Sequence, residues 1–268
     1  MSKTILVTGS TDGIGRQTAL ELLRLGHRVI VHGRSPAKTA AAAEGLRTES
    51  ASQSVDTWAC DLSSLAAIRA AAPALLSAHP KLDVLLHNAG IFMNTREVSA
   101  EGYELTFAVN HLAPFLLTHL LAPALEAAAP SRVIVVSSVA HARGTVDFND
   151  LQYLSGFTGY ASYVRSKLCN VLFAAELAER WKDQRIAANS LHPGVVGTKL
   201  LREGFGMEGN DSLSQGAATS VHLAVAPEVE GITGKYFANK REAPLGRLAR
   251  DLEVRRKLWD ESARLCGW

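Results

Sequence analysis

Short apolar runs alternate with longer helical stretches through most of this 268-residue chain. The apolar runs are bounded by polar or glycine-containing turns, which is typical of buried strands. They predict strands at Thr4–Thr8, Arg28–His32, Val55–Cys60, Val84–Asn88, Arg132–Ser138, Arg185–Leu191 and Lys235–Ala238. The stretches between them predict helices at Ile14–Leu25, Pro36–Arg47, Leu65–Ser77, Tyr103–Ala128 and Tyr160–Lys182. Strands separated by helices indicate βαβ units. We therefore expect one α/β domain over residues 1–268, with a doubly wound parallel sheet.

Two long stretches interrupt this alternation, at residues 141–159 and 195–215, and both contain several glycines. Loops of this length inside a compact domain are usually lids or binding loops. We expect them to shape a substrate pocket.

The composition fits a domain with a large core, since 47% of the residues are hydrophobic and 20% are charged. A net charge of +2 gives no reason to expect a nucleic-acid partner. The three cysteines are an odd number without metal-ligand spacing, so we expect neither a disulfide framework nor a metal site. The chain opens almost directly on an apolar strand, and no apolar run approaches the ~20 residues of a membrane span. These features predict a soluble, cytoplasmic protein without a membrane anchor.

A glycine cluster lies between the first predicted strand and the first predicted helix. It consists of Gly9, Ser10, Thr11, Asp12, Gly13, Ile14 and Gly15. Glycines permit a tight turn and let the backbone approach a pyrophosphate, which is stabilised by the positive end of the helix. The spacing is GxxxGxG rather than GxGxxG, but its position favours a dinucleotide site in a Rossmann-type sheet.

The end of the second predicted strand distinguishes NAD from NADP. An NAD site usually places an acidic residue there, whereas an NADP site places an arginine near the 2′-phosphate. Here the strand is followed by Gly33, Arg34 and Ser35, without an acid. The planar guanidinium of Arg34 suits a phosphate, and Arg16 is a weaker second candidate. We therefore expect NADP(H) rather than NAD(H).

Tyr163 and Lys167 are four residues apart in a predicted helix, so their side chains share one face. A phenol with a pKa near ~10 is a poor acid or base at neutral pH, and a neighbouring cation favours the phenolate. The pair therefore predicts a proton donor whose pKa the lysine lowers. Chance YxxxK matches are common on solvated helix faces. Whether this pair is catalytic therefore depends on whether the rest of the chain forms a site around it.

Several motifs occur in the order found in short-chain dehydrogenases/reductases, and the chain resembles that family over nearly its whole length. These motifs are Thr8–Gly15, His87-Asn88-Ala89-Gly90, Asn110, Ser138, Tyr163xxxLys167 and His192-Pro193-Gly194. The long Ser138–Tyr163 spacing and the run Leu191–Thr198 resemble the retinol dehydrogenase branch. The resemblance implies an NADP(H)-dependent carbonyl reductase or alcohol dehydrogenase that acts on a hydrophobic ketone, aldehyde or secondary alcohol.

The resemblance also implies a role for each matching residue. Tyr163 would donate or accept the proton, and Lys167 would hold the nicotinamide ribose. Ser138, preferred over the adjacent Ser137, would bind the substrate oxygen. Asn110 would support a water-mediated proton relay from a kinked helix. Cofactor contacts would come from Asp61, Leu62, Asn88, Ala89, Gly90, Pro193, Gly194, Val195 and Thr198, as well as Tyr163 and Lys167. Asp61 could instead cap the following helix.

The candidates share one position in the predicted fold. Each of six motifs follows the carboxyl end of a predicted strand, where open parallel sheets bind their ligands. Two departures from the family stand out: His87 replaces a first asparagine, and the apolar N-terminal anchor of membrane-bound retinol dehydrogenases is missing.

Other functions and assemblies stay open. One alternative is a non-catalytic dinucleotide-binding regulator on the same scaffold, which would be expected to lose the Tyr or Lys. Another is a nucleotide-sugar epimerase or dehydratase, which generally has a larger substrate subdomain. The resemblance implies a homodimer or homotetramer, formed through helices Tyr103–Ala128 and Tyr160–Lys182.

Overall fold

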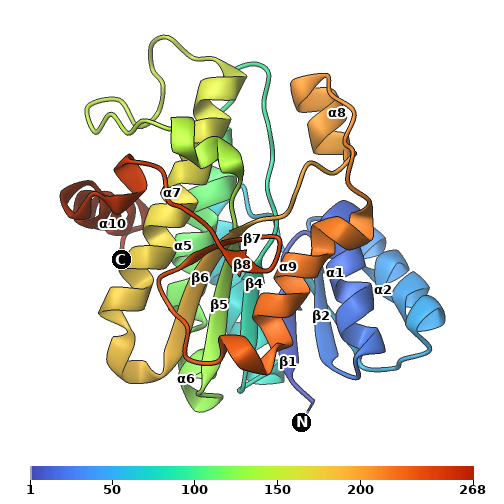
Figure 1. Ribbon diagram of the computed structural model, residues 1–268. Coiled ribbons are helices and arrows are strands. Elements are labelled where there is room, and N and C mark those ends of the chain that lie inside the picture. Colours follow the sequence, from blue (N-terminus) through green and yellow to red (C-terminus); the bar gives the residue numbers. More distant parts are fainter. Residues whose placement is uncertain (1) are drawn as a thin grey trace.

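Eight strands form one sheet in the computed structural model, which describes residues 2–268 (Figure 1). They are β1 Thr4–Val7, β2 Arg28–Gly33, β3 Val55–Ala59, β4 Val84–His87, β5 Ser131–Val136, β6 Ile186–His192, β7 Tyr236–Ala238 and β8 Arg241–Glu242. The order is β3-β2-β1-β4-β5-β6-β7-β8; neighbours from β3 to β7 are parallel, and β8 is antiparallel to β7. The strand order reverses between β1 and β4, which creates a crevice at their carboxyl ends. The expected doubly wound α/β fold is confirmed.

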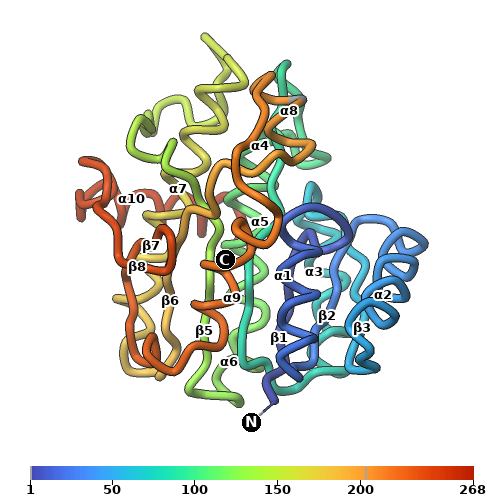
Figure 2. The backbone as a smooth tube through the Cα atoms, turned by 45° about the vertical axis from the view of Figure 1, so that its right-hand side comes forward, coloured from blue at the N-terminus to red at the C-terminus, as the bar shows by residue number. Residues whose placement is uncertain are grey.

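Helices cover both faces of the sheet (Figures 1 and 2). On one face lie α1 Gly13–Arg24, α2 Pro36–Ser50 and α9 Leu213–Val225; on the other lie α3 Leu65–Ala78, α5 Ala113–Leu120 and α7 Gly159–Arg180. Successive side chains of β1 point to opposite faces of the sheet. Ile5 and Val7 belong to the hydrophobic cluster on the face covered by α1, α2 and α9, and Leu6 belongs to the cluster on the other face. The carboxyl-terminal α10, Leu252–Cys266, packs outside α5 and α7. The helix α10 thus covers part of the surface that the predicted assembly would use.

The single helix predicted over Tyr103–Ala128 is divided into several pieces. These are α4 Leu105–Phe107, a π-helix over Ala108–Leu112, then α5 and α6 Ala122–Ala127. Pro114, in the first turn of α5, lacks the N–H that would bond the carbonyl of Asn110 in a regular helix. Pro123 likewise has no N–H to donate in the first turn of α6. Prolines therefore account for the irregular path of this segment.

The two stretches predicted as long loops contain short helices. A 3₁₀-helix spans Val139–Arg143, and α8 spans Lys199–Phe205 after the N-cap Thr198. The helix α9 begins at Leu213, because Ser212 and Gln215 form a capping box. In Figure 2, α8 lies above the carboxyl ends of the strands.

Within residues 2–268, no helix is long and apolar enough to cross a membrane. No group of three or more His, Cys, Asp or Glu side chains in that range could hold a metal ion.

Candidate active site

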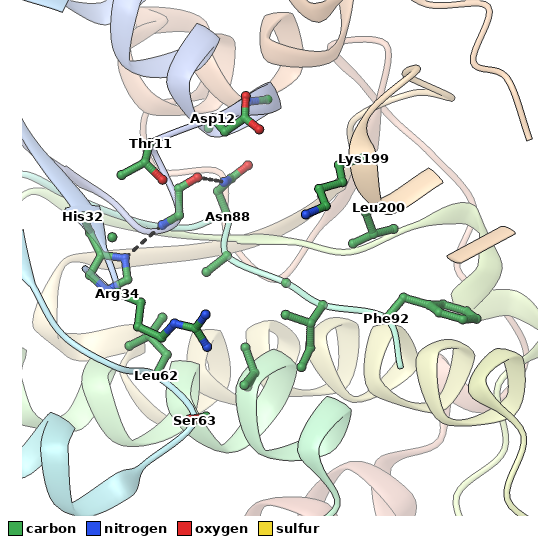
Figure 3. Close-up of a pocket in the computed structure, with 18 of the residues that line it drawn as sticks. Thr11, Asp12, His32, Arg34, Leu62, Ser63, Asn88, Phe92, Lys199 and Leu200 are labelled. Atoms are coloured by element: carbon green, nitrogen blue, oxygen red, sulfur yellow. Dashed lines mark hydrogen bonds between the residues drawn. The ribbon is translucent and has the colours of Figure 1, made fainter. Parts of the chain in front are cut away.

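A cleft of about 570 Å³ opens at the carboxyl ends of β1 to β4, where the strand order reverses (Figure 3). We call it the cofactor cleft. Most residues predicted to contact a dinucleotide line it: Gly9, Thr11, Asp12, Gly13, Ile14, Gly15, Arg34, Asp61, Leu62, Asn88, Ala89, Gly90 and Thr198. Motifs that are up to 189 residues apart in the sequence, from Gly9 to Thr198, thus meet in one depression.

The turn after β1 requires glycine at two positions. Gly9 has a φ of +63°, and a Cβ there would lie 2.8 Å from Cα of Ala89. A Cβ on Gly15 would lie 2.2 Å from the carbonyl oxygen of Gly9. Only glycine, which has no Cβ, lets the backbone of this turn pack so closely against these atoms. The turn leads into α1, whose amino end suits a pyrophosphate.

His32 holds this turn from the neighbouring strand. Its Nδ1 accepts a hydrogen bond from the Gly9 amide at 2.9 Å, and its Nε2 lies 3.1 Å from the carbonyl oxygen of Cys60. The Nε2 atom therefore carries the proton. Burial lowers the pKa of His32 to about 4, so the ring is neutral at physiological pH.

Two candidates for phosphate contacts lie away from the cleft. Ser10 is fully buried: its hydroxyl donates to Val7 and accepts from the His32 amide. Arg16 pairs with Glu49, so it is not a free phosphate-binding cation. These positions depend on contacts to distant parts of the chain, which the local motif does not reveal.

Arg34 follows β2 and points into the cofactor cleft (Figure 3). In the part of the chain that the structure describes, no carboxylate forms an ion pair with it. A guanidinium without an internal partner retains all its donors for a phosphate.

Asn88 and Asp61 have structural bonds as well as a place in the cleft. The Nδ2 atom of Asn88 donates to the carbonyls of Thr8 and Gly9 at 2.9 and 3.1 Å, which joins β4 to the phosphate turn. Asp61 Oδ1 accepts from the amide and hydroxyl of Ser63. The alternative that Asp61 caps α3 is wrong, because Ser64 is the N-cap.

Tyr163 lies in the second turn of α7, whose amino end is capped by Thr158. Ser138, two residues after β5, faces the phenol and lowers its pKa. The adjacent Ser137 instead donates to the carbonyl of Lys167 at 2.7 Å. Because neighbouring residues of an extended segment point in opposite directions, only one of the two serines can reach the phenol.

Lys167 lies on the same side of α7, with Nζ 5.5 Å from the centroid of the Tyr163 ring. The amine donates to the carbonyl of Val136 at 3.1 Å, and burial lowers its pKa to about 8. Burial also raises the pKa of Tyr163 to about 12, against a lowering effect of Ser138. The prediction that the lysine brings the phenol below its ordinary pKa is therefore wrong for this structure, since desolvation dominates.

Asn110 occupies the middle of the π-helix and is fully buried. It donates to the carbonyl of Ile91 at 3.0 Å and to the hydroxyl of Ser166 at 2.9 Å, and its Oδ1 accepts from the Ile91 amide. A Cβ on Gly90 would lie 3.5 Å from this oxygen and 3.4 Å from Nζ of Lys167. Asn110 and Lys167 thus contact the same short segment after β4.

Aromatic rings cover the phenol on the side of α8. The ring centroids of Phe205 and Phe92 lie 5.1 and 5.7 Å from that of Tyr163, and 4.7 Å from each other. Tyr163 is consequently 8% exposed and does not line the cofactor cleft. Nor do Ser10, Asn110, Ser138, Lys167, Pro193, Gly194 or Val195. The nucleotide end of the site is open, whereas the reacting end is filled by side chains.

The segment that leads into α8 is fixed by one carboxylate. Gly194 has a φ of +105°, and the Val195 amide donates to Asp211 at 2.6 Å. Thr198 accepts from the Leu201 amide as N-cap of α8, and it also lines the cofactor cleft.

A family model described as short chain dehydrogenase matches residues 3–208. The chain belongs to this family. It is 40% identical to retinol dehydrogenase 14 and to retinol dehydrogenase 13, both from Homo sapiens. These alignments cover 99% of this chain, and 86% and 85% of the relatives. The predicted retinol dehydrogenase-like branch is thereby confirmed, and the protein is an oxidoreductase that acts on CH–OH groups.

Solved structures of similar proteins agree with the fold. An uncharacterized protein from Mycobacterium Paratuberculosis is 31% identical with a TM-score of 0.81, and the match covers 99% of this chain and 93% of that one. A short chain dehydrogenase from Escherichia coli CFT073, complexed with NADPH, is 25% identical with a TM-score of 0.74. That match covers 89% and 97% of the two chains. Members of the short-chain dehydrogenase family bind a nicotinamide dinucleotide.

Sequence reasoning missed several residues of the site. His32, Ser63, Phe92, Lys199 and Leu200 all line the cofactor cleft (Figure 3). Lys199 and Leu200 directly follow Thr198, and Phe92 is two residues beyond Gly90, so longer motifs would have included them. The role of His32 could not be read locally, because its bonds reach Gly9 and Cys60 on other strands.

Proposed function

We propose that this chain transfers a hydride between NADP(H) and a hydrophobic ketone, aldehyde or secondary alcohol, with Tyr163 as the acid or base. The observation that carries this proposal is the cluster of Ser138, Tyr163 and Lys167, with Ser138 facing the phenol and Lys167 on the same side of α7, beside a cleft suited to a dinucleotide. When bound, the nicotinamide supplies or accepts the hydride.

The buried phenol is protonated at neutral pH, because its pKa is raised to about 12. In the reductive direction it can donate this proton to the oxygen that gains negative charge. Ser138 then provides a second hydrogen bond to that oxygen. Lys167, whose pKa is lowered to about 8, is largely cationic at pH 7 and stabilises the phenolate left behind.

Asn110 is proposed to position the segment after β4, and to support a water-mediated relay of protons to Lys167. Its side chain holds both the amide and the carbonyl of Ile91, and it bonds the α7 residue Ser166. It therefore joins the segment that lines the cofactor cleft to the helix that carries the tyrosine.

The cofactor preference rests on Arg34. The residues of the cleft fit a dinucleotide, since the glycine turn lines the cleft and leads into the amino end of α1, where backbone amides can bind a pyrophosphate. Arg34 lies in this cleft without a carboxylate partner among the described residues, which favours a 2′-phosphate over a free hydroxyl. Solved structures of similar proteins in complex with NADPH or NADP support the same preference.

The proposed substrate is apolar, because aromatic rings surround the phenol. Phe92 and Phe205 lie beside Tyr163, and Tyr160 contacts Phe205 with centroids 6.2 Å apart. The names of the relatives, retinol dehydrogenases 13 and 14, fit a hydrophobic alcohol or its carbonyl product. We further propose a cytoplasmic location for this activity.

The test is a substrate panel with purified protein. NADPH absorbance is followed with aromatic and medium-chain aldehydes and ketones, and NADP⁺ reduction with the matching secondary alcohols. Each pair is repeated with NADH and NAD⁺. We expect turnover with at least one apolar carbonyl and a preference for NADPH; binding of NADPH without turnover of any member would favour the non-catalytic regulator.

A further inference from the structure

A second cleft, of about 310 Å³, lies at the opposite end of the sheet from the cofactor cleft. Four segments contribute to its lining: Lys3 before β1, residues 130–132 at the start of β5, Lys182 with residues 185–187 at the start of β6, and Glu230, Gly231 and Thr233 before β7. In Figure 1 this is the lower end of the sheet, where the chain begins. We call it the basal cleft.

Cations predominate in the basal cleft. Lys3, Arg132, Lys182 and Arg185 line it, against the single carboxylate of Glu230. Lys182 lies 3.6 Å from Glu179, but the other three cations form no ion pair within the described residues. Like charges that converge on a small concave surface create a positive potential that attracts anions.

Arg132 is the buried member of this group, at 7% exposure. Its Nη1 donates to the carbonyls of Leu223 and Ala226 at 2.9 and 3.1 Å, at the carboxyl end of α9. The negative end of the helix therefore compensates part of its charge. Among the described residues, no acceptor is bonded to Nε or Nη2, so these donors are available to a ligand.

Hydrogen bonding between β5 and the residue before β6 places Arg185 at the basal cleft. Strands β5 and β6 are paired there, and the Ser131 amide donates to the carbonyl of Arg185 at 3.2 Å. Arg185 is exposed, so its guanidinium can turn toward the cleft. Ser131 is also among the residues that line the cleft, and its buried hydroxyl has no hydrogen-bond partner in the part of the chain that is described. Buried hydroxyls are normally bonded.

We propose that the basal cleft binds a small oxyanion with two or more negative charges, such as a phosphate ester or a polycarboxylate. Arg132 and Arg185 would provide planar donors, and Lys3 a point charge. The volume lies at the lower end of the range for ligand pockets, which suits a compact anion rather than a dinucleotide. This site is separate from the hydride-transfer site, and its existence does not depend on the proposed reaction.

Calorimetric titration with inorganic pyrophosphate tests the proposal, because it measures stoichiometry and affinity together. Pyrophosphate can also enter the cofactor cleft, so the titration is made with and without saturating NADP⁺. A parallel titration with citrate distinguishes phosphate from carboxylate ligands. We expect one site that persists in the presence of NADP⁺. Failure of both anions to bind, or loss of all binding when NADP⁺ is present, would overturn the proposal.

Charge-reversal variants locate the site. Arg185→Glu and Lys3→Glu should each weaken the NADP⁺-resistant binding by about tenfold or more, because each replaces an attraction with a repulsion. Arg256→Glu is the matched control: it makes the same charge change at an exposed position of α10. It should alter affinity by less than about twofold. Equal weakening in Arg185→Glu and Arg256→Glu would show that only the net charge matters, and would refute a defined site.

Discussion

Replacing Lys167 with methionine should stabilise the cofactor-free protein while it abolishes turnover. The amine is buried, and its environment lowers the pKa to about 8. A buried cation with a lowered pKa destabilises the folded state whenever it is protonated. Methionine has a similar length and carries no charge, so it removes this penalty with little change in packing.

The size of the effect follows from the pKa. Lowering it from 10.5 to about 8, at about 1.36 kcal/mol per pKa unit, costs about 3 kcal/mol at pH 7. Loss of the bond from Nζ to Val136 offsets about 1 kcal/mol. The Val136 carbonyl is not left unpaired, because Asn170 also donates to it at 3.2 Å. The net gain for Lys167→Met is therefore about 2 kcal/mol at pH 7.

The pH dependence gives this prediction its signature. Wild-type stability carries the full penalty below the folded-state pKa and recovers as the pH rises toward the unfolded-state pKa. Between pH 8 and about pH 9.5 the advantage of Lys167→Met should fall by about 2 kcal/mol. Titrations of other groups, such as Tyr163, are common to both proteins and cancel in the difference.

Urea denaturation of both proteins at pH 7 and at about pH 9.5 measures this difference, with Lys182→Met as the control. Lys182 is 63% exposed, so its replacement should change stability by less than about 0.5 kcal/mol at either pH. If Lys167→Met were less stable than wild type at pH 7, with no dependence on pH, the burial argument would be refuted.

Three further substitutions test separate parts of the site. Arg34→Ala should raise the NADPH dissociation constant by about tenfold or more and that of NADH by less than about threefold; equal losses in fluorescence titrations would remove the phosphate role. Ser138→Ala should lower kcat by about a hundredfold, whereas Ser137→Ala, which loses only a bond to the α7 backbone, should retain kcat within a few-fold. Phe205→Ala uncovers the Tyr163 ring, so steady-state kinetics should show a change in KM for apolar substrates of about tenfold at unchanged NADPH affinity; an unchanged KM would mean that α8 does not contact the substrate.

Much of the fold could be predicted because the strands are buried on both faces and read as apolar runs. The glycine turn after β1, Arg34 after β2 and Asn88 after β4 followed from this, since parallel strands bring their carboxyl ends to one edge. These predictions depend on local patterns and on topology alone. Most of the residues predicted to contact a dinucleotide line the cofactor cleft.

The remaining features depend on tertiary contacts that a local pattern does not contain. The pairing of Arg16 with Glu49 joins two residues 33 positions apart, and it removes a cation that the sequence offered as a phosphate ligand. The buried position of Ser10, whose hydroxyl accepts from the His32 amide, and the bond from the Gly9 amide to His32 also depend on contacts between distant parts of the chain. The π-helix around Asn110 could have been suspected from Pro114, which interrupts the hydrogen bonding of a regular helix. The helical pattern of apolar residues, however, continues on both sides of this segment.

The pKa of Tyr163 is the feature of the site that was least predictable from the sequence. Spacing alone suggests that Lys167 lowers the pKa of Tyr163, but the depth of the site cannot be read from spacing. Phe92 and Phe205 pack against the Tyr163 ring, and desolvation of the phenol outweighs the lowering effect of Ser138 on its pKa. The result is a protonated donor, which suits reduction of a carbonyl at neutral pH.

The central claim is that the Tyr163 phenol transfers the proton in a hydride-transfer reaction. The most direct test compares wild type with Tyr163→Phe, which removes one hydroxyl, in NADPH oxidation with the best carbonyl of the panel and in NADPH binding by fluorescence. Loss of general acid catalysis should reduce kcat by about a thousandfold, while the dissociation constant of NADPH changes less than about threefold, because the phenol does not line the cofactor cleft. Turnover within tenfold of wild type, with NADPH still bound, would contradict the role assigned to Tyr163.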